Sequence, residues 1–156
     1  MNITVTQQQK DGRISVVRLR RLAVWLIGRA GLRFSALEIL LTDDAGIVTA
    51  NHAVFGRDYV TDVISLAYPP LPGEQGGAGE LIINVAMAAR EGASRAGGLD
   101  RELALYLAHG CDHLAGADDA TPHQRAAMRR RELRWLRTAA HAGLLRGLFP
   151  RLGKKK

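Results

Sequence analysis

Two histidines separated by four positions, His109 and His113, are the sequence feature that most constrains this chain. In an α-helix, residues i and i+4 lie one above the other on the same face, so both imidazoles can reach one metal ion. Gly116 follows three residues later and can adopt the left-handed conformation that ends a helix. Beyond it come Asp118 and Asp119. The order helix, turn and carboxylate predicts a third ligand from outside the helix, which leaves a tetrahedral ion one open position, as in catalytic zinc sites.

Two residues compete for the place of this third ligand. Asp119 directly follows the turn at Gly116, whereas His123 begins the next expected helix, ten residues after the second histidine. We favour Asp119 because the turn points toward it, and we interpret Asp118 as a residue that orients a ligand histidine through its other ring nitrogen. A thermolysin-type protease is disfavoured, because its general-base glutamate would stand where this chain has Gly110.

The stretch from His109 to Asp119 resembles the signature of the YbeY family, the metal-dependent endoribonucleases of bacteria that act in rRNA maturation. That signature reads H-G-x-L-H-L-x-G-Y-D-H. The positions that match it in place are His109, Gly110, His113, Leu114, Gly116 and Asp118. A second family segment, approximately Y-R-G-x-D-x-P-T-D-V-L-S-F, is similar to residues 54–66, and a third, G-D-[IL]-x-I, is similar to residues 79–83. The resemblance spans roughly residues 34–140 in the family's order.

The resemblance implies that His109, His113 and Asp119 hold one Zn²⁺, with Asp119 standing where the family has its third histidine. A carboxylate oxygen binds zinc at about the same distance as an imidazole nitrogen. Two histidines and one carboxylate also suit Mn²⁺, Ni²⁺ or Fe²⁺. The family's arginine in the second segment falls on Phe55, so we take Arg57, two residues later, as the candidate phosphate contact.

The implied function is that of a zinc-dependent, single-strand-specific endoribonuclease. It would act in maturation of the 16S rRNA 3′ end and in ribosome quality control, with rRNA and the small ribosomal subunit as partners. Two alternatives stay open. The presence of Phe55 in place of the arginine favours a non-catalytic ribosome-associated factor with a structural metal. In the other alternative, the chain is a small-molecule metallohydrolase whose basic segment only keeps it soluble.

Positive charge is concentrated near the C-terminus. Residues 123–156 contain eleven arginines and lysines and one glutamate, whereas the whole chain has a formal net charge of +7. Such a segment is either a solvated helix face or a contact for a phosphate backbone. The family resemblance favours contact with nucleic acid.

The hydrophobic pattern predicts one α+β domain over residues 1–150, followed by a basic tail at 151–156. We expect a small mixed sheet of about four strands packed with helices, and the metal site on a central helix. Strands are expected at 2–7, 36–41, 61–66 and 80–84. Helices are expected at 16–30, from 43 or 44 to 54, at 85–96, 99–115 and from 121 to at least 140, the last with a capping box. Residues 10–12 read as a turn, and residues 68–79 as a loop that could cover the cleft.

Composition and the remaining single residues agree with a cytoplasmic enzyme. Apolar residues make up 47% of the 156 positions, enough for a packed core. We expect no secretory signal and no membrane partner, because the apolar runs are short. Cys111, the single cysteine, should pack in the core, since it projects away from the two histidines. We also expect Trp25 and Trp135 to pack in the core, and His52 and His141 to bind no metal.

Overall fold

The computed structural model describes residues 1–9 and 14–150, and within them strands and helices follow one another with short connections. In chain order, the elements are β1 (Asn2–Gln7), α1 (Val16–Ala30), β2 (Phe34–Thr42), α2 (Asp44–Phe55), β3 (Val63–Tyr68), β4 (Gly77–Asn84), α3 (Val85–Ala93), α4 (Gly98–Leu114) and α5 (Pro122–His141). The predicted bounds of β1 and α1 are confirmed in full. The turn predicted at 10–12 and the tail at 151–156 lie outside the described residues.

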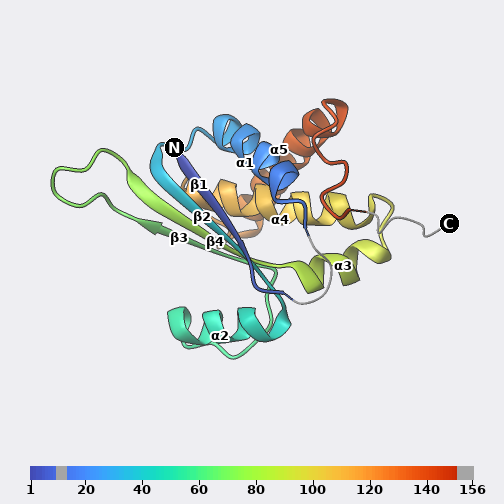
Figure 1. Cartoon of the computed structure of the whole chain (residues 1–156), viewed down its shortest axis with the longest axis horizontal. Coiled ribbons are helices and arrows are strands. Elements are labelled where there is room, and N and C mark those ends of the chain that lie inside the picture. Colours follow the sequence, from blue (N-terminus) through green and yellow to red (C-terminus); the bar gives the residue numbers. More distant parts are fainter. Residues whose placement is uncertain (10–13, 151–156) are drawn as a thin grey trace.

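Within the described residues, four strands form one mixed sheet in the order β1-β2-β4-β3 (Figure 1). β1 and β4 both run parallel to β2, whereas β3 is antiparallel to β4. Val5 is paired with Ile39, Ile39 with Leu81, and Leu81 with Ser65, which aligns the four strands across the sheet. Parallel neighbours need a crossover connection, whereas antiparallel neighbours can be joined by a hairpin. The predicted α+β class with a mixed four-stranded sheet is confirmed.

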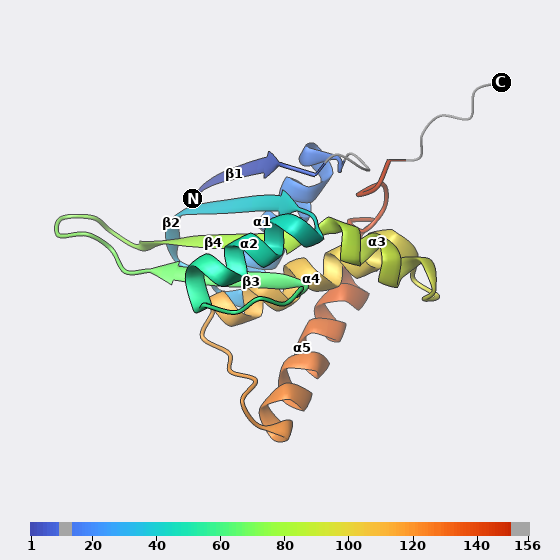
Figure 2. The same cartoon turned by 90° about the horizontal axis from the view of Figure 1, so that it is seen from below.

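Helices cover both faces of the sheet (Figures 1 and 2). On the face covered by α1 and α4, Leu37 and Ile39 are buried in the main core. On the opposite face, Ile47 of α2 forms a second small core with Ile64 and Ile82. The central strands are therefore apolar on both sides, which explains why they form nearly continuous apolar runs in the sequence. Across the described helices, none combines the length and the apolar character needed to cross a bilayer.

The segment 68–79 differs from the predicted loop. Tyr68 pairs with Ala78 and Ala67 with Gly79, so both ends of the segment belong to strands. Gly77 lies so close to the carbonyl oxygen of Tyr68 that an added Cβ atom would collide with it. In the sequence this glycine indicates a loop. In the structure it is required because the backbones of two neighbouring strands approach each other closely at this position. The connection shortens to residues 69–76, which project beyond the sheet as a hairpin (Figure 1).

Candidate metal centre

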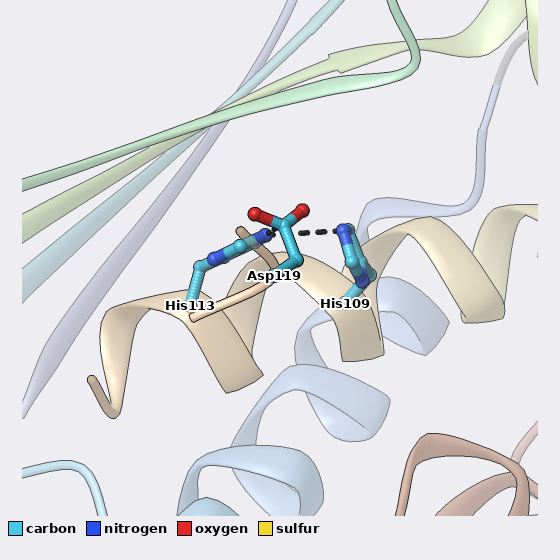
Figure 3. Close-up of side chains that lie close together, drawn as sticks. All are labelled: His109, His113 and Asp119. Atoms are coloured by element: carbon cyan, nitrogen blue, oxygen red, sulfur yellow. Dashed lines mark hydrogen bonds and ion pairs between the residues drawn. The ribbon is translucent and has the colours of Figure 1, made fainter. Parts of the chain in front are cut away.

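Asp119 approaches the two histidines of α4 from the loop that follows this helix (Figure 3). His109 and His113 lie one turn apart, and their Nε2 atoms are 3.1 Å from each other. Gly116, with φ 99°, turns the chain back after α4. Asp119 Oδ2 then lies 3.4 Å from His113 Nε2, and one ligand atom of each residue lies within 4.8 Å of the others. The structure thus brings together the three residues that the sequence predicts as ligands.

The spacing of these atoms suits a tetrahedral ion. Ligand bonds of about 2.0–2.1 Å place any two ligands of tetrahedral zinc about 3.3 Å apart. The His109–His113 and His113–Asp119 separations, 3.1 and 3.4 Å, lie on either side of that value. The ligand atoms of all three residues lie within 4.8 Å of one another, a range that an ion bound at their centre would narrow.

The hydrogen bonds of the other ring nitrogens also favour a cation. His109 Nδ1 donates to both carboxylate oxygens of Glu132, at 3.0 and 3.1 Å, and His113 Nδ1 donates to the carbonyl oxygen of Ala117 at 3.1 Å. A neutral imidazole with its proton on Nδ1 presents a lone pair at Nε2. Two lone pairs and the carboxylate of Asp119 therefore face one another. This donor set fits a divalent metal ion, whose charge would relieve the repulsion.

The prediction that Asp118 orients a ligand histidine is wrong. Its Oδ1 accepts hydrogen bonds from the backbone N–H groups of Asp119 and Ala120, at 2.8 and 3.3 Å. These bonds form a local turn of the kind that aspartate favours. Asp118 therefore shapes the loop that carries the third ligand, and other groups hold the imidazoles.

Glu132 of α5 is the orienting residue that the sequence reasoning missed. It is only 4% exposed, between the buried residues Met128 and Leu136 on the apolar face of α5. The sequence did contain a signal, because Glu132 is the single acid among eleven basic residues in 123–156 and stands four positions from each of those apolar neighbours.

The charge of Glu132 changes the chemistry of His109. Burial lowers the pKa of this imidazole, but the hydrogen bond and charge of Glu132, together with the charges of Asp62 and Asp119, raise its pKa above the ordinary value. A carboxylate that raises the basicity of a ligand imidazole also strengthens its bond to a metal. Glu132 thus supports His109 in both position and electron density.

Arg131, the residue before Glu132, holds the same helix crossing through a second contact. Its Nε and Nη2 donate to the two carboxylate oxygens of Asp112, at 2.8 and 3.0 Å. Asp112 is 2% exposed and lies on α4 between the two histidines, where the family signature has leucine. Two adjacent residues of α5 therefore bind α4, one through the ligand His109 and one through Asp112.

α4 can lie directly against the sheet because Gly110 has no side chain. A Cβ atom added there would come within 2.8 Å of Leu81 and 3.3 Å of Val63. The hydroxyl of Ser65 donates to the carbonyl oxygen of Gly110 at 3.3 Å.

The packing role predicted for Cys111 is confirmed, since this residue is fully buried and burial raises the pKa of its thiol to about 12.

The other histidines lie outside the ligand group. His123 is exposed at the start of α5, and His52 pairs with Asp58 at 2.6 Å. Among the described residues, the group able to hold a metal consists of the two α4 histidines and Asp119. Trp25 and Trp135 pack against the main core.

The ligand group lies in the wall of a cavity of about 440 Å³. The rest of the wall comes from the end of α2, the connection 56–62 and β3. Arg57, the predicted phosphate contact, lines this cavity, and so do Thr61 and Ser65. Arg57 Nη1 donates to Tyr59 Oη at 3.1 Å, and the guanidinium keeps further N–H groups for a ligand. Residues 69–76, predicted as a possible cover, do not line this cavity.

Two further hollows adjoin the ligand group. One, also of about 440 Å³, lies between α3, α4 and α5 and is lined by His109, Glu132 and Arg129. The other, of about 230 Å³, is lined by His109, Asp119, Arg125 and Arg129. The metal-binding face is therefore reached from several sides, with arginines of α5 on one of them.

The chain is similar to known proteins over most of its length. The family model described as Endoribonuclease YbeY matches residues 4–140. The Endoribonuclease YbeY of Anaeromyxobacter dehalogenans is 33% identical over 143 residues, which cover 92% of this chain and 74% of that protein. The Endoribonuclease YbeY of Elusimicrobium minutum is 38% identical over 105 residues, 65% of this chain and 73% of that protein.

A solved structure confirms the fold independently. The solution structure of a Thermotoga maritima protein superposes with a TM-score of 0.61 at 18% identity, covering 98% of this chain and 99% of that chain. A sequence identity of 18% supports a shared fold and nothing further. The family model and the relatives, together with the ordered motifs, show that this chain belongs to the YbeY family of endoribonucleases.

Proposed function

We propose that this chain is a zinc-dependent endoribonuclease that cleaves single-stranded RNA within the cytoplasm, with the 3′ region of 16S rRNA in the small ribosomal subunit as its substrate. The observation that carries this proposal is the convergence of His109, His113 and Asp119 in the wall of a cavity that also contains Arg57. Membership of the family supports the reaction class.

The three ligand residues would hold one divalent ion and leave a position of its coordination sphere open toward the cavity. When bound, such an ion supplies Lewis acidity toward a phosphoryl oxygen and lowers the pKa of water. Two imidazoles and one carboxylate suit zinc, and they also accommodate Mn²⁺, Ni²⁺ or Fe²⁺. Glu132 would keep His109 in the tautomer that presents Nε2 to the ion.

Arg57, a cation of this cavity, would act on the substrate directly. Arg57 has N–H groups beyond the one that binds Tyr59, and these can contact a phosphate oxygen. Negative charge develops on the phosphoryl oxygens during hydrolysis, so a guanidinium held in the cavity stabilises the transition state more than the ground state. Thr61 and Ser65 lie on the same wall, and each already donates its hydroxyl hydrogen within the protein, to Asp62 and to the carbonyl oxygen of Gly110, so the charge contact falls to Arg57.

Single-turnover cleavage of an RNA fragment containing the 3′ end of 16S rRNA tests the proposal. We expect His113→Ala and Asp119→Ala to lose both the metal and the cleavage, whereas Asp119→His should keep both, because histidine is also a zinc ligand. His123→Ala is the matched control and should behave like the unmutated protein. Chelation should abolish cleavage and added zinc should restore it. Full cleavage by His113→Ala would refute the proposal.

One observation favours a second function. Phe55 stands where the family pattern has an arginine, so a phosphate contact of that pattern is missing. In that case the protein would bind the small ribosomal subunit without cutting RNA, and its metal would be structural. Subunit binding that survives His109→Ala, together with no cleavage by the unmutated protein at any metal concentration, would support this alternative.

A further inference from the structure

Four large apolar side chains are exposed around the connection between α2 and β3. They are Val54, Phe55, Tyr59 and Val60, with exposed fractions from 39% to 52%. Exposed apolar residues are common singly, so what singles out any of these four is their relation to the cavity. Phe55 and Tyr59 line the cavity that contains the metal ligands, whereas Val54 and Val60 do not. The two aromatic residues are therefore the part of this surface that faces the candidate active site.

Arg57 joins the two aromatic residues into one wall. Its guanidinium carbon lies 5.3 Å from the centroid of the Phe55 ring, and its Nη1 donates to the hydroxyl of Tyr59 at 3.1 Å. Two aromatic rings and a planar cation thus stand together in the wall of the cavity that also contains the ligand residues of α4. This combination is used by proteins that bind unpaired nucleic acid, since rings stack on bases and arginine contacts the backbone.

The wall is held in place by the protein before any ligand binds. Asn51, which is 2% exposed, donates from Nδ2 to the carbonyl oxygen of Tyr59 at 3.0 Å. The carbonyl oxygen of Asn51 accepts from the N–H of Arg57 at 3.4 Å. His52 pairs with Asp58 in the same connection. A ligand would therefore meet a fixed surface and would not have to order a loose loop, which favours affinity.

We propose that Phe55 and Tyr59 form a nucleobase subsite, which stacks an unpaired base of the RNA next to the phosphate that is cut. The proposal rests on the proposed function, because it takes RNA as the ligand of this cavity. Where the family pattern has a cation, this chain has an aromatic ring, and Arg57 supplies the charge from two residues away. The substitution at residue 55 thereby exchanges a phosphate contact for a base contact. A base inside a duplex is already stacked, so the subsite selects unpaired nucleotides.

Binding measured without metal separates this subsite from catalysis. We would titrate the full chain, in the presence of a chelator, into a short single-stranded RNA that contains one 2-aminopurine, and into the same RNA with an abasic ribose at that position. Stacking on an aromatic ring quenches the 2-aminopurine fluorescence. Because stacking contributes about 5- to 160-fold in affinity per base, the base-containing RNA should bind tighter than the abasic RNA by a factor in this range.

Variants assign the effect to the ring. Phe55→Ala and Tyr59→Ala should each lose quenching and reduce the preference for the base-containing RNA, whereas Phe55→Trp should keep both. Phe55→Leu, which is apolar without being aromatic, should behave like Phe55→Ala. Val54→Ala and Val60→Ala are matched controls from the same exposed surface and should bind like the unmutated protein. An unchanged fluorescence in the unmutated protein, or equal binding by Phe55→Ala, would overturn the proposal.

Failure of the subsite and failure of the proposed function give different results. If the unmutated protein cleaves RNA and Phe55→Ala binds and cleaves equally well, the subsite is wrong and the nuclease stands. If the protein never cleaves but shows quenching that depends on Phe55, stacking of a base on this wall stands and the nuclease is wrong. If Phe55→Ala loses only its binding to the small ribosomal subunit, while base preference is absent throughout, the surface binds protein and the proposal is overturned.

Discussion

At the scale of single residues, Glu132 is the buried acid through which α5 acts on a ligand histidine. Changing it to glutamine keeps a carbonyl acceptor for His109 Nδ1 but removes the charge, and changing it to alanine removes both. Partners of this kind usually affect metal affinity by about 10- to 100-fold. We therefore expect Glu132→Gln to weaken zinc binding by about tenfold and Glu132→Ala by about a hundredfold.

Competition between the protein and a chromophoric zinc chelator would measure these affinities directly. Glu91→Gln is the matched control, because Glu91 lines the same hollow as Glu132 but contacts Arg95 and not a ligand. Equal zinc affinity for Glu132→Ala and the unmutated protein would show that the hydrogen bond has no influence on the metal.

Residues could be predicted from the sequence where their partners are close along the chain. His109 and His113 lie on one helix, so helix geometry brings them together, and the turn at Gly116 returns Asp119 to them within six residues. Glu132 lies 23 residues from its partner His109, and their contact depends on how α4 and α5 cross. The spacing of apolar residues does not predict the angle at which two helices cross. The sequence therefore favours the nearby Asp118 as the residue that orients a ligand histidine, a role that Glu132 fills in the structure.

At the scale of elements, the crossing of α4 and α5 depends on the pair of Asp112 and Arg131. Removing one partner of a buried pair costs about 3–5 kcal/mol when a charge is left buried without compensation. Asp112 is almost fully buried, whereas the Arg131 side chain is 34% exposed and could turn toward water. We expect Arg131→Met to reduce the free energy of unfolding by about 3 kcal/mol, and Asp112→Leu by about 1 kcal/mol, since the arginine left behind remains solvated.

Urea unfolding of the metal-free protein at constant m-value would test this asymmetry. The double variant should recover most of the loss, because apolar replacements of a buried pair are often neutral. Arg90→Met breaks the exposed pair with Asp44 and should leave the free energy of unfolding nearly unchanged, because water screens this pair. A larger loss for Asp112→Leu than for Arg131→Met would contradict our account of the pair.

Elements could be predicted where one local pattern determines them. The capping box of Thr121 and Gln124 predicts the start of α5, and both of its hydrogen bonds form. The ends of β3 and β4 could not be predicted in this way. Gly77 and its neighbours resemble a loop by composition, and only the approach of the Tyr68 carbonyl shows that a strand needs a glycine there.

At the scale of the whole molecule, α5 projects from the domain beside the metal-binding face (Figure 2). Arg129, Arg130 and Arg134 are exposed along it. Each phosphate contact of a single strand contributes about 0.7 to the slope of log affinity against log salt concentration. Replacing all three arginines by alanine should therefore lower the slope for single-stranded RNA by about 2.

Anisotropy titrations over a range of salt concentrations would give this slope. Replacing Arg20, Arg21 and Arg33 removes the same charge from exposed positions on α1 and just before β2 and is the matched control. We expect that variant to change the slope little. An equal change in both triple variants would mean that the total charge of the protein matters and that the position of α5 does not.

The third ligand lies on a loop, and this has a consequence for how such proteins diverge. Asp119 has a side chain that is 46% exposed on a loop, whereas the two histidines, 28% and 26% exposed, stand on α4, a helix whose other residues build the main core. A mutation at residue 119 changes the charge and hardness of the donor set and leaves every core contact in place. Lineages can therefore change which metal they prefer through a single codon, without first acquiring a compensating mutation that protects the fold.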